Sequence, residues 1–264
     1  MNERVIVSMT SYPKRIGNVG RSIFALLNKQ TRCPDEIHLW LAKENFPKMN
    51  EDLPPDLQVL IHNERVFLHW LDVDMKVHKR HEIFKIAKDS DCVFLIDDDV
   101  YYSNELIETV MKTHEKFPDC IICYNSYSPH VYDGRHIKYL KNLPESEPKA
   151  NYNRWCGQSM IPAKIYPKTI LDDAHQLMRN ATSPISDECW FQPWTVYYDI
   201  PIYHLKFDWG KDISSNTGKN SGLVAWSHKK DNAGYTFRDN WLYAVLQAYP
   251  EILEKYKRKF NYGK

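Results

Sequence analysis

The 264-residue chain lacks an excess of charge of either sign. Its 35 lysines and arginines are balanced by 34 aspartates and glutamates, so the formal net charge is +1. A protein that holds DNA or RNA through a general positive field is strongly basic, and this chain is not. We therefore expect no nucleic-acid partner.

Long apolar runs are also missing. No stretch approaches the roughly 20 apolar residues that cross a membrane as a helix. Residues 1–10 contain neither an apolar segment of sufficient length nor a small-residue cleavage site for export. We expect a cytoplasmic protein.

Cysteine is scarce, with six residues scattered along the chain and several of them inside apolar runs. Such positions are typical of reduced thiols in a cytoplasmic protein. Cys120 and Cys123 form a C-x-x-C, but in a strand positions three apart face opposite sides, and no second pair exists. We expect neither a zinc site nor redox use of this pair. Aromatic residues are abundant, with 17 tyrosines and 8 tryptophans, and their rings suit sugar faces as well as cores and interfaces.

Apolar periodicity indicates alternating strands and helices in the first half. Strands are predicted at 5–9, 37–41, 58–61 and 92–96, and helices from about Asn18 to Leu27, at 77–87 and from Ser103 to Phe117. This order predicts a mostly parallel sheet with helices on both sides. Residues 133–153 are polar, contain two prolines and read as a long loop or lid. No repeat or linker interrupts the chain, so one continuous domain over 1–264 is expected.

Three consecutive aspartates, Asp97, Asp98 and Asp99, follow the apolar run at 92–96. The run is typical of a strand buried on both faces, and its carboxyl end is where open α/β sheets bind ligands. Adjacent carboxylates repel one another unless a cation, a helix N-terminus or solvent neutralises them. A hard divalent ion that also binds substrate phosphates is the natural partner. A solvated acidic turn capping the next helix is the alternative.

Several segments together resemble the GT-A nucleotide-sugar glycosyltransferases, specifically the bacterial surface-polysaccharide enzymes. The segments are VIVSMTSYPKRI at 5–16, the D-x-K-x-x-K pattern from Asp74 to Lys79, the D-x-D pattern at Asp97–Asp99, CGQSMIP at 156–162 and DECWF at 187–191. The resemblance covers roughly residues 4–200. The acidic triplet and the opening strand are its most specific parts, while the glycine-containing loop has fewer glycines than is usual in the family.

The resemblance implies a GT-A (Rossmann-like) fold, with residues 1–125 binding a nucleotide-diphosphate sugar, UDP-sugars favoured, and residues 126–264 binding the acceptor. It implies a Mn²⁺ or Mg²⁺ ion held by Asp97 and Asp99, with His228 as a third ligand. The implied donor contacts are Thr10, Tyr12, Arg15, Asp74, Lys76, Lys79, Asp97 and Asp98. For the lysines and Arg15, ordinary solvated side chains are the alternative. For Tyr12 it is a core or surface tyrosine, and for His228 a structural or surface role.

An inverting transfer needs a carboxylate within hydrogen-bond reach of the acceptor hydroxyl. The resemblance places Asp187 and Glu188 in this role, at the start of a helix that Ser186 or Asp187 would cap. The family more often has aspartate at the second position, so the choice between the two stays open. Pro193 predicts that this helix is kinked or begins again.

The expected activity is transfer of a sugar to a saccharide or lipid-linked acceptor in capsule or lipopolysaccharide synthesis. Basic and aromatic residues alternate at 253–262, which suits either a solvated helix end or peripheral contact with the inner face of the cytoplasmic membrane. Two other functions stay open. A sugar nucleotidyltransferase would carry a glycine-rich phosphate loop after the first strand, and residues 8–13 do not. A carbohydrate-binding protein that had lost turnover would need neither metal nor nucleotide.

Overall fold

The computed structural model describes residues 3–131, 137–140, 146–149, 155–172, 186–205, 213–215 and 231–260. The chain divides into two compact units, each made of several segments. Unit 1 contains Met1–Asp119, Gln158–Lys168 and Phe207–Asn216, and unit 2 contains Cys120–Gly157, Thr169–Lys206 and Thr217–Lys264. The units are described separately below.

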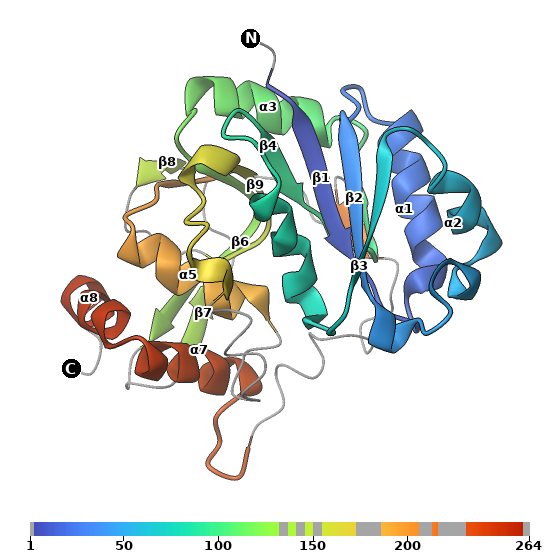
Figure 1. Ribbon diagram of the computed structural model, residues 1–264. Helices are drawn as coiled ribbons and strands as arrows, with labels where there is room; N and C mark the ends of the chain where they lie inside the picture. The colour runs from blue at the N-terminus through green and yellow to red at the C-terminus, as the bar shows by residue number, and fades with distance from the viewer. Residues whose placement is uncertain are drawn as a thin grey trace. The chain divides into compact units, whose positions relative to one another are not determined.

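The centre of unit 1 is a sheet of four parallel strands in the order β3-β2-β1-β4 (Figure 1). Their bounds are Val5–Thr10 for β1, Glu36–Ala42 for β2, Val66–Leu71 for β3 and Cys92–Leu95 for β4. An antiparallel strand, β9 (Trp155–Pro162), pairs with β4. A separate ribbon joins β5 (Val100–Tyr102) to β11 (Ile213–Ser215) in antiparallel pairing. The predicted α/β class with a mostly parallel sheet is confirmed.

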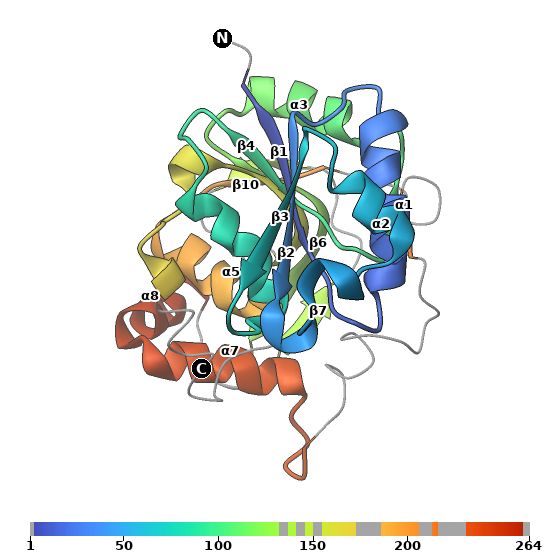
Figure 2. The same ribbon diagram turned by 45° about the vertical axis from the view of Figure 1, so that its right-hand side comes forward.

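Helices cover both faces of this sheet, with α1 and α2 on one side and η3 on the other (Figure 2). The helical elements of unit 1 are α1 (Ile16–Asn28), α2 (Pro55–Leu60), α3 (Leu106–Lys116) and the 3₁₀ segments η1 (Lys43–Asn45), η2 (Met49–Asp52), η3 (Lys76–Lys85) and η4 (Ala163–Ile165). Along the sheet, the connection from β3 to β4 runs in the opposite direction to the connection from β1 to β2. A right-handed connection therefore places η3 on the face opposite α1.

The central strands form the core of unit 1, as the apolar runs predict. In β1 the side chains from Val5 to Val7 are at most 1% exposed, and in β4 Val93 and Phe94 are fully buried. On α1 the apolar positions at helical spacing, Val19, Ile23, Leu26 and Leu27, are all buried. The sequence pattern thus identifies the strand that carries the aspartates correctly.

Several local predictions are wrong. Residues 58–61 are not a strand, because Pro55 occupies the first turn of α2, where its fixed φ favours a helix. The third strand is β3, which lies further along the chain. The helices α1 and α3 begin after Arg15 and Glu105 instead of at Asn18 and Ser103. The expected helix at 77–87 is the 3₁₀ segment η3, with Lys76 at its start in the left-handed region (φ 50°).

Unit 2 contains a parallel pair, β6 and β10, with antiparallel partners β7 on β6 and β8 on β10. The bounds are Ile121–Val131, Ile202–His204, Ile137–Leu140 and Ser146–Lys149 for β6, β10, β7 and β8. Three helices, α5 (Asp187–Tyr197), α7 (Phe237–Ala248) and α8 (Pro250–Phe260), pack together. Helix α5 continues through Pro193 without the predicted new start.

The prediction of reduced thiols throughout needs correction. Cys123, fully buried in β6, is disulfide-bonded, whereas Cys33, Cys92, Cys120 and Cys189 carry free thiols. Position within an apolar run reports burial, and it does not report whether another sulfur lies within bonding distance. In the part of the chain that the structure describes, no helix is long and apolar enough to span a membrane.

Candidate active site

The candidate site of unit 1 lies where β1 and β4 end. The chain leaves β1 at Thr10 and turns into α1, and it leaves β4 at Leu95 and passes through the three aspartates to β5. Because β1 and β4 are parallel neighbours, their carboxyl ends meet at the same edge of the sheet. The segment 11–15 and the acidic triplet are therefore brought together, as the sequence predicts.

Asp98 is the structural member of the triplet. It is 4% exposed, its Oδ2 accepts a hydrogen bond from the Ser11 hydroxyl at 2.5 Å, and its Oδ1 lies 2.5 Å from a guanidinium nitrogen of Arg15. Burial raises the pKa of the Asp98 carboxyl to about 6, although Arg15 and Ser11 act in the opposite direction. Ser22 on α1 also donates to the Asp98 backbone carbonyl, at 3.2 Å. These contacts fix the loop that carries the other two acids.

Asp97 and Asp99 are more accessible, with side chains 33% and 15% exposed. Each forms an ion pair with an arginine: Asp97 Oδ1 lies 2.6 Å from Arg80 Nη1, and Asp99 contacts Arg15. The backbone N–H of Asp97 donates to the Tyr102 hydroxyl at 3.1 Å. Arg15 therefore bridges Asp98 and Asp99, and the two guanidinium groups offset two of the three carboxylate charges.

Of the predicted donor contacts near this edge, Tyr12 has the most accessible side chain. It is 37% exposed, and the Arg15 guanidinium carbon lies 5.8 Å from its ring centroid. A partly exposed ring beside a cation offers a face for stacking a planar base. Thr10 is tied into the sheet, since its hydroxyl donates to the Trp40 carbonyl at 2.7 Å.

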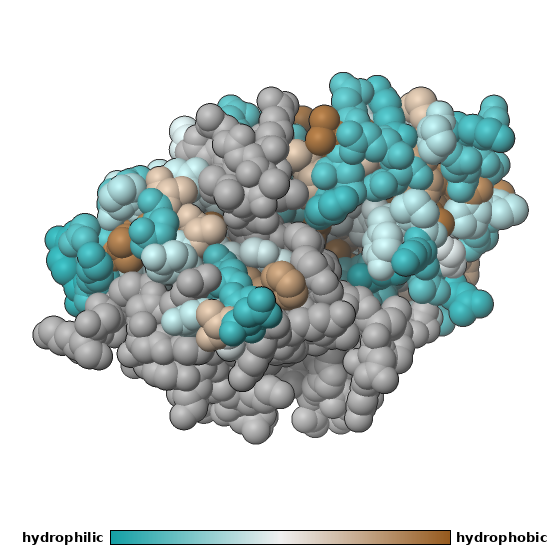
Figure 3. Space-filling view, turned by 90° about the horizontal axis from the view of Figure 1, so that it is seen from below, coloured by the Kyte–Doolittle hydropathy of each residue, from teal (hydrophilic) through white to brown (hydrophobic). Residues whose placement is uncertain are grey.

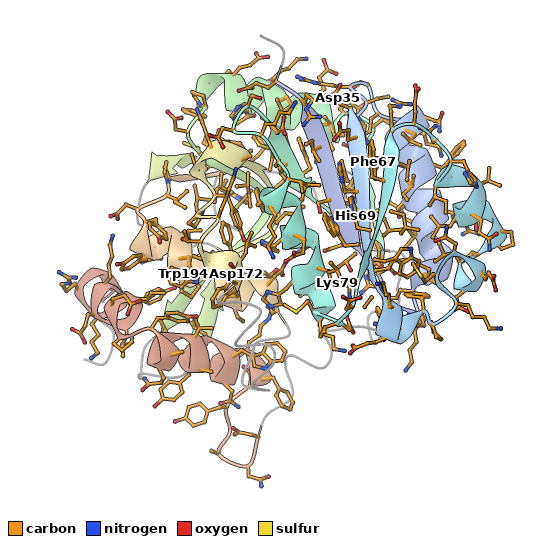
Figure 4. All side chains as sticks on the ribbon, in the orientation of Figure 1. Asp35, Phe67, His69, Lys79, Asp172 and Trp194 are labelled. Atoms are coloured by element: carbon orange, nitrogen blue, oxygen red, sulfur yellow. The ribbon has the colours of Figure 1, made fainter. Side chains whose placement is uncertain are left out.

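The other predicted donor residues form a second ionic cluster around η3. Lys76 Nζ lies 2.6 Å from Asp74 Oδ2, and Lys79, which is 1% exposed, donates to Asp74 Oδ1. Burial alone would raise the pKa of the Asp74 carboxyl, but the ammonium groups of Lys79 and Lys76 hold that pKa well below its usual range. Lys79 is thus a buried ion-pair partner on η3, not a solvated lysine (Figure 4).

Lys79 also connects this cluster electrostatically to the triplet, because it and Asp98 attract each other. The following residue, Arg80, is 3% exposed and reaches Asp97 directly. Sequence reasoning assigned no role to Arg80 or Ser11. The adjacency of Arg80 to the D-x-K-x-x-K pattern was the available signal, but a 3₁₀ segment places side chains differently from the expected α-helix.

The predicted acceptor-side acids belong to unit 2, at the first turn of α5. Asp187 is 4% exposed, and Glu188 Oε2 lies 3.1 Å from Arg238 Nη2 on α7. Ser186 occupies the N-cap position, as predicted, without a capping hydrogen bond from its side chain. Behind these acids, Trp190 and Trp194 are buried and meet edge to face, with centroids 5.7 Å apart. Arg238 thus restrains Glu188, which sequence reasoning did not foresee.

Two predicted features, His228 and most of the 133–153 loop, lie outside the described residues.

The charged residues of α8 form ion pairs. Lys257 pairs with Glu254 at 2.8 Å and Lys255 with Asp199 at 2.5 Å. On the face in Figure 3, hydrophilic side chains (teal) cover much of the described surface, with hydrophobic ones (brown) scattered among them. Contact of α8 with a membrane stays a prediction.

The residues fit a hard divalent cation only in part. Asp97 and Asp99 supply the oxygen ligands that Mg²⁺ and Mn²⁺ prefer, and such ions need only one or two carboxylates when substrate phosphates supply the rest. Asp98 is turned toward Ser11 and Arg15 and is not available as a third ligand. The donor set therefore suits an ion that arrives together with a diphosphate.

No protein-family model and no curated protein matches the sequence. Solved structures with a similar fold include S. aureus TarS 1–349, with 12% identity and a TM-score of 0.42 over 76% of this chain and 58% of that one. The complex of TarS 1–349 with UDP-GlcNAc has 12% identity and a TM-score of 0.43 over 79% of this chain and 60% of that one. Another is 4-diphosphocytidyl-2C-methyl-D-erythritol synthase from Anaerococcus prevotii, with 10% identity and a TM-score of 0.46 over 83% of this chain and 94% of that one. This chain spans about three fifths of the TarS 1–349 chains.

Proposed function

We propose that the protein is a glycosyltransferase of GT-A type that moves a sugar from a nucleotide-diphosphate donor to a saccharide or lipid-linked acceptor. One observation carries the proposal. Two accessible carboxylates, Asp97 and Asp99, stand at the carboxyl edge of a parallel sheet beside the exposed ring of Tyr12. A base-stacking face next to oxygen ligands for a cation suits a nucleoside diphosphate.

The arginines and lysines of the site support this assignment. Arg15 and Arg80 pair with the acids in the protein alone. A donor diphosphate brings further negative charge to this edge, and both guanidinium groups are close enough to the acids to interact with it as well. Asp74 holds Lys79 on η3, so the buried ammonium stays near the same edge. These residues position the donor.

Metal dependence is part of the proposal. Asp99, together with Asp97, would hold Mn²⁺ or Mg²⁺, and such an ion when bound neutralises charge that develops on the leaving diphosphate. His228 is proposed as a further ligand on resemblance alone. A role in capsule or lipopolysaccharide synthesis likewise rests on the resemblance.

Asp187 and Glu188 are the proposed sources of a base for the acceptor hydroxyl. The base must accept a proton at one carboxylate oxygen while that oxygen points at the hydroxyl. Arg238 binds one oxygen of Glu188 and so limits the orientations of that carboxylate. Transfer activity in the Asp187→Asn and Glu188→Gln variants decides which of the two acids removes the proton.

The test of the donor site is a thermal-shift panel of UDP, GDP, CMP, dTDP and ADP, each with and without Mn²⁺. One nucleotide with Mn²⁺, at about 100 times its dissociation constant, should raise the Tm by about 5 °C. The rise should vanish in Asp99→Asn and persist in the matched control Asp89→Asn, an exposed aspartate just before β4 that pairs with Lys168 at 3.2 Å.

Silence across the panel in a well-folded protein would contradict the proposal and favour a carbohydrate-binding protein. A different result would identify a sugar nucleotidyltransferase. In that case a nucleoside triphosphate stabilises the protein, and its reaction with a sugar 1-phosphate releases pyrophosphate. Either result replaces the proposed function, since both leave the glycosyl-transfer step without a donor.

A further inference from the structure

A second group of metal-ligating side chains lies in unit 1, away from the acidic triplet. Glu3, Cys92 and His114 bring a carboxylate oxygen, a thiol sulfur and an imidazole nitrogen within 4.8 Å of one another. In the described part of the chain, no other set of three histidine, cysteine or acidic side chains comes this close together. The glycosyl-transfer proposal gives these residues no role.

The three residues meet because of the strand pairing and the packing of α3. Val5 of β1 is in register with Cys92, the first residue of β4, and the Cys92 N–H donates to the Arg4 carbonyl at 2.8 Å. Glu3 therefore enters next to the start of β4. His114 is on the buried face of α3, in its last turn. Figures 1 and 2 both show the chain entering β1 beside α3.

Two of the three distances between the ligand atoms are close to those of a tetrahedral site, and the third is within 4.8 Å. The His114 Nε2 to Glu3 Oε2 distance is 3.1 Å, and the Cys92 Sγ to Glu3 Oε2 distance is 3.8 Å. Ligand atoms bound at about 2.0–2.3 Å to a tetrahedral zinc ion lie roughly 3.3–3.8 Å apart. The observed side chains need only small adjustments to enclose such an ion.

Burial distinguishes this group from ordinary surface contacts. Cys92 and His114 are each 1% exposed, while the Glu3 side chain is 39% exposed and leaves one side open to water. Burial, with the negative charge of Glu3, raises the pKa of the Cys92 thiol to about 12. The Nδ1 atom of His114 is buried without a hydrogen-bond partner. A buried sulfur facing a carboxylate is unfavourable as a thiolate, and a bound cation reverses that.

We propose that Glu3, Cys92 and His114 form a binding site for Zn²⁺ or a similar borderline-soft transition-metal ion, with water as a fourth ligand on the exposed side. The thiolate and imidazole select such an ion over Mg²⁺ and Mn²⁺, which prefer oxygen ligands. The site is at the amino ends of β1 and β4, and the acidic triplet follows the carboxyl end of β4. It joins the segment before β1 to β4 and α3, so the bound ion stabilises unit 1.

Cobalt is the probe that identifies the sulfur ligand, because Co²⁺ bound to a thiolate gives a near-ultraviolet charge-transfer band that oxygen-bound Co²⁺ lacks. The 264-residue protein with its disulfide intact, stripped of metal, is titrated with Co²⁺ and then with Zn²⁺. We expect a band that saturates at one equivalent and disappears when Zn²⁺ displaces the cobalt. Zn²⁺ should also raise the Tm.

Three variants and two controls make the assignment specific. The band should be lost in Cys92→Ser and reduced in His114→Gln and Glu3→Gln, and each variant should keep the circular dichroism of the native fold. Glu3→Gln carries little risk to folding because the side chain is partly exposed. The band should persist in Cys33→Ser, which removes an exposed thiol, and in Asp99→Asn, which removes the other candidate cation site.

A native-like protein that shows no thiolate band, or one whose band survives in Cys92→Ser, would overturn the proposal. In that case the three side chains are only a hydrogen-bonded cluster, with the Cys92 thiol donating to Glu3. A band that depends on Cys92 supports the proposal whatever the nucleotide panel shows, so the two proposals succeed or fail independently.

Discussion

Arg15 is the residue on which the geometry of the acidic triplet depends. Its guanidinium group contacts Asp98 and Asp99, with its side chain 17% exposed and that of Asp98 5% exposed. Loss of one partner leaves a buried carboxylate without compensation, which costs far more than the pair contributes as a whole. Arg15→Ala should therefore lower the free energy of unfolding by about 2–4 kcal/mol, measured by urea denaturation at pH 7.5.

The matched control for this change is Arg21→Ala, which removes an exposed arginine from the same helix and should have little effect. The double variant Arg15→Ala/Asp98→Asn should recover part of the lost stability, because the unpaired charge is gone. Equal losses in the single and double variants would show that Arg15 acts through packing and not through its charge.

At this scale the sequence predicts which residue types gather, but not how they pair. The three aspartates, Tyr12 and Arg15 were all identified from the motif and its neighbours. Alternation along a continuing strand also predicts that Asp98 points away from its two neighbours and toward the fold, and Asp98 is buried between the two more accessible acids. Arg80 was missed, since its approach to Asp97 depends on the 3₁₀ geometry of η3.

The paired strands β2 and β3 carry a stack of rings on one face. His38 and His69 are stacked with centroids 5.1 Å apart, and the His69 ring lies 3.9 Å from Trp40. His38 Nδ1 and His69 Nε2 are 2.9 Å apart. Figure 4 shows His69 and Phe67 together on β3. The stack requires at least one neutral imidazole, because two adjacent imidazolium ions repel each other.

The acid stability of the fold should therefore depend on these strands. Burial, and secondarily the charge of His38, lowers the pKa of His69 to about 4, against about 6.5 in the unfolded chain. Between pH 6.5 and 4 the unfolded state binds more protons, so the free energy of unfolding falls as the pH falls. The contribution of His69 between pH 7 and 5 is at most about 2 kcal/mol, because solvent screens the partly exposed ring.

The measurement is the free energy of unfolding in urea at pH 7, 6 and 5. His69→Gln should flatten the dependence relative to the native protein, whereas His62→Gln, at an exposed position, should leave it unchanged. Burial also lowers the pKa of His38. Glu36, which pairs with His38 at 3.1 Å and with Arg4 at 2.5 Å, acts against that lowering. An identical slope in His69→Gln would show that other groups dominate the acid response.

Apolar periodicity predicts a helix or strand correctly where one face of the element is apolar. It fails where a proline or a short connection determines the backbone conformation. The strands β1, β2 and β4 and the buried stripes of α1 and α3 follow from periodicity. The stretch at 58–61 is apolar enough for a strand, yet Pro54 and Pro55 direct it into α2. In β3 five of the six residues are apolar, so the sequence does carry a signal for this edge strand, although most of its side chains are only partly buried.

At the scale of the whole molecule, the residues proposed for the donor side and those proposed for the acceptor side belong to different compact units. The donor-side residues Tyr12, Arg15 and Asp97–Asp99 belong to unit 1, and the acceptor-side acids Asp187 and Glu188 belong to unit 2. The sequence predicts both groups but not the composition of the units, because segments from three parts of the chain build each one. A donor-binding half at 1–125 and an acceptor-binding half at 126–264 stay a prediction.

This division predicts that binding and turnover respond separately to mutation. Loss of the carboxylate that serves as the base, Asp187→Asn or Glu188→Gln, should lower kcat for sugar transfer by about 100-fold or more. Stabilisation by the donor nucleotide should be unchanged in that variant, because the proposed donor contacts all belong to unit 1. Asp99→Asn should instead abolish the nucleotide-dependent rise in Tm.

Arg238 separates a base at Glu188 from one at Asp187. If Glu188 is the base, Arg238→Ala should also lower kcat, because the carboxylate loses the partner that orients it at 3.1 Å. Arg238→Lys keeps the charge and should recover part of the activity. If Asp187→Asn alone abolishes transfer while Glu188→Gln and Arg238→Ala remain active, the Glu188–Arg238 pair only joins α5 to α7. Full transfer activity in both acid variants would remove these acids from the chemistry.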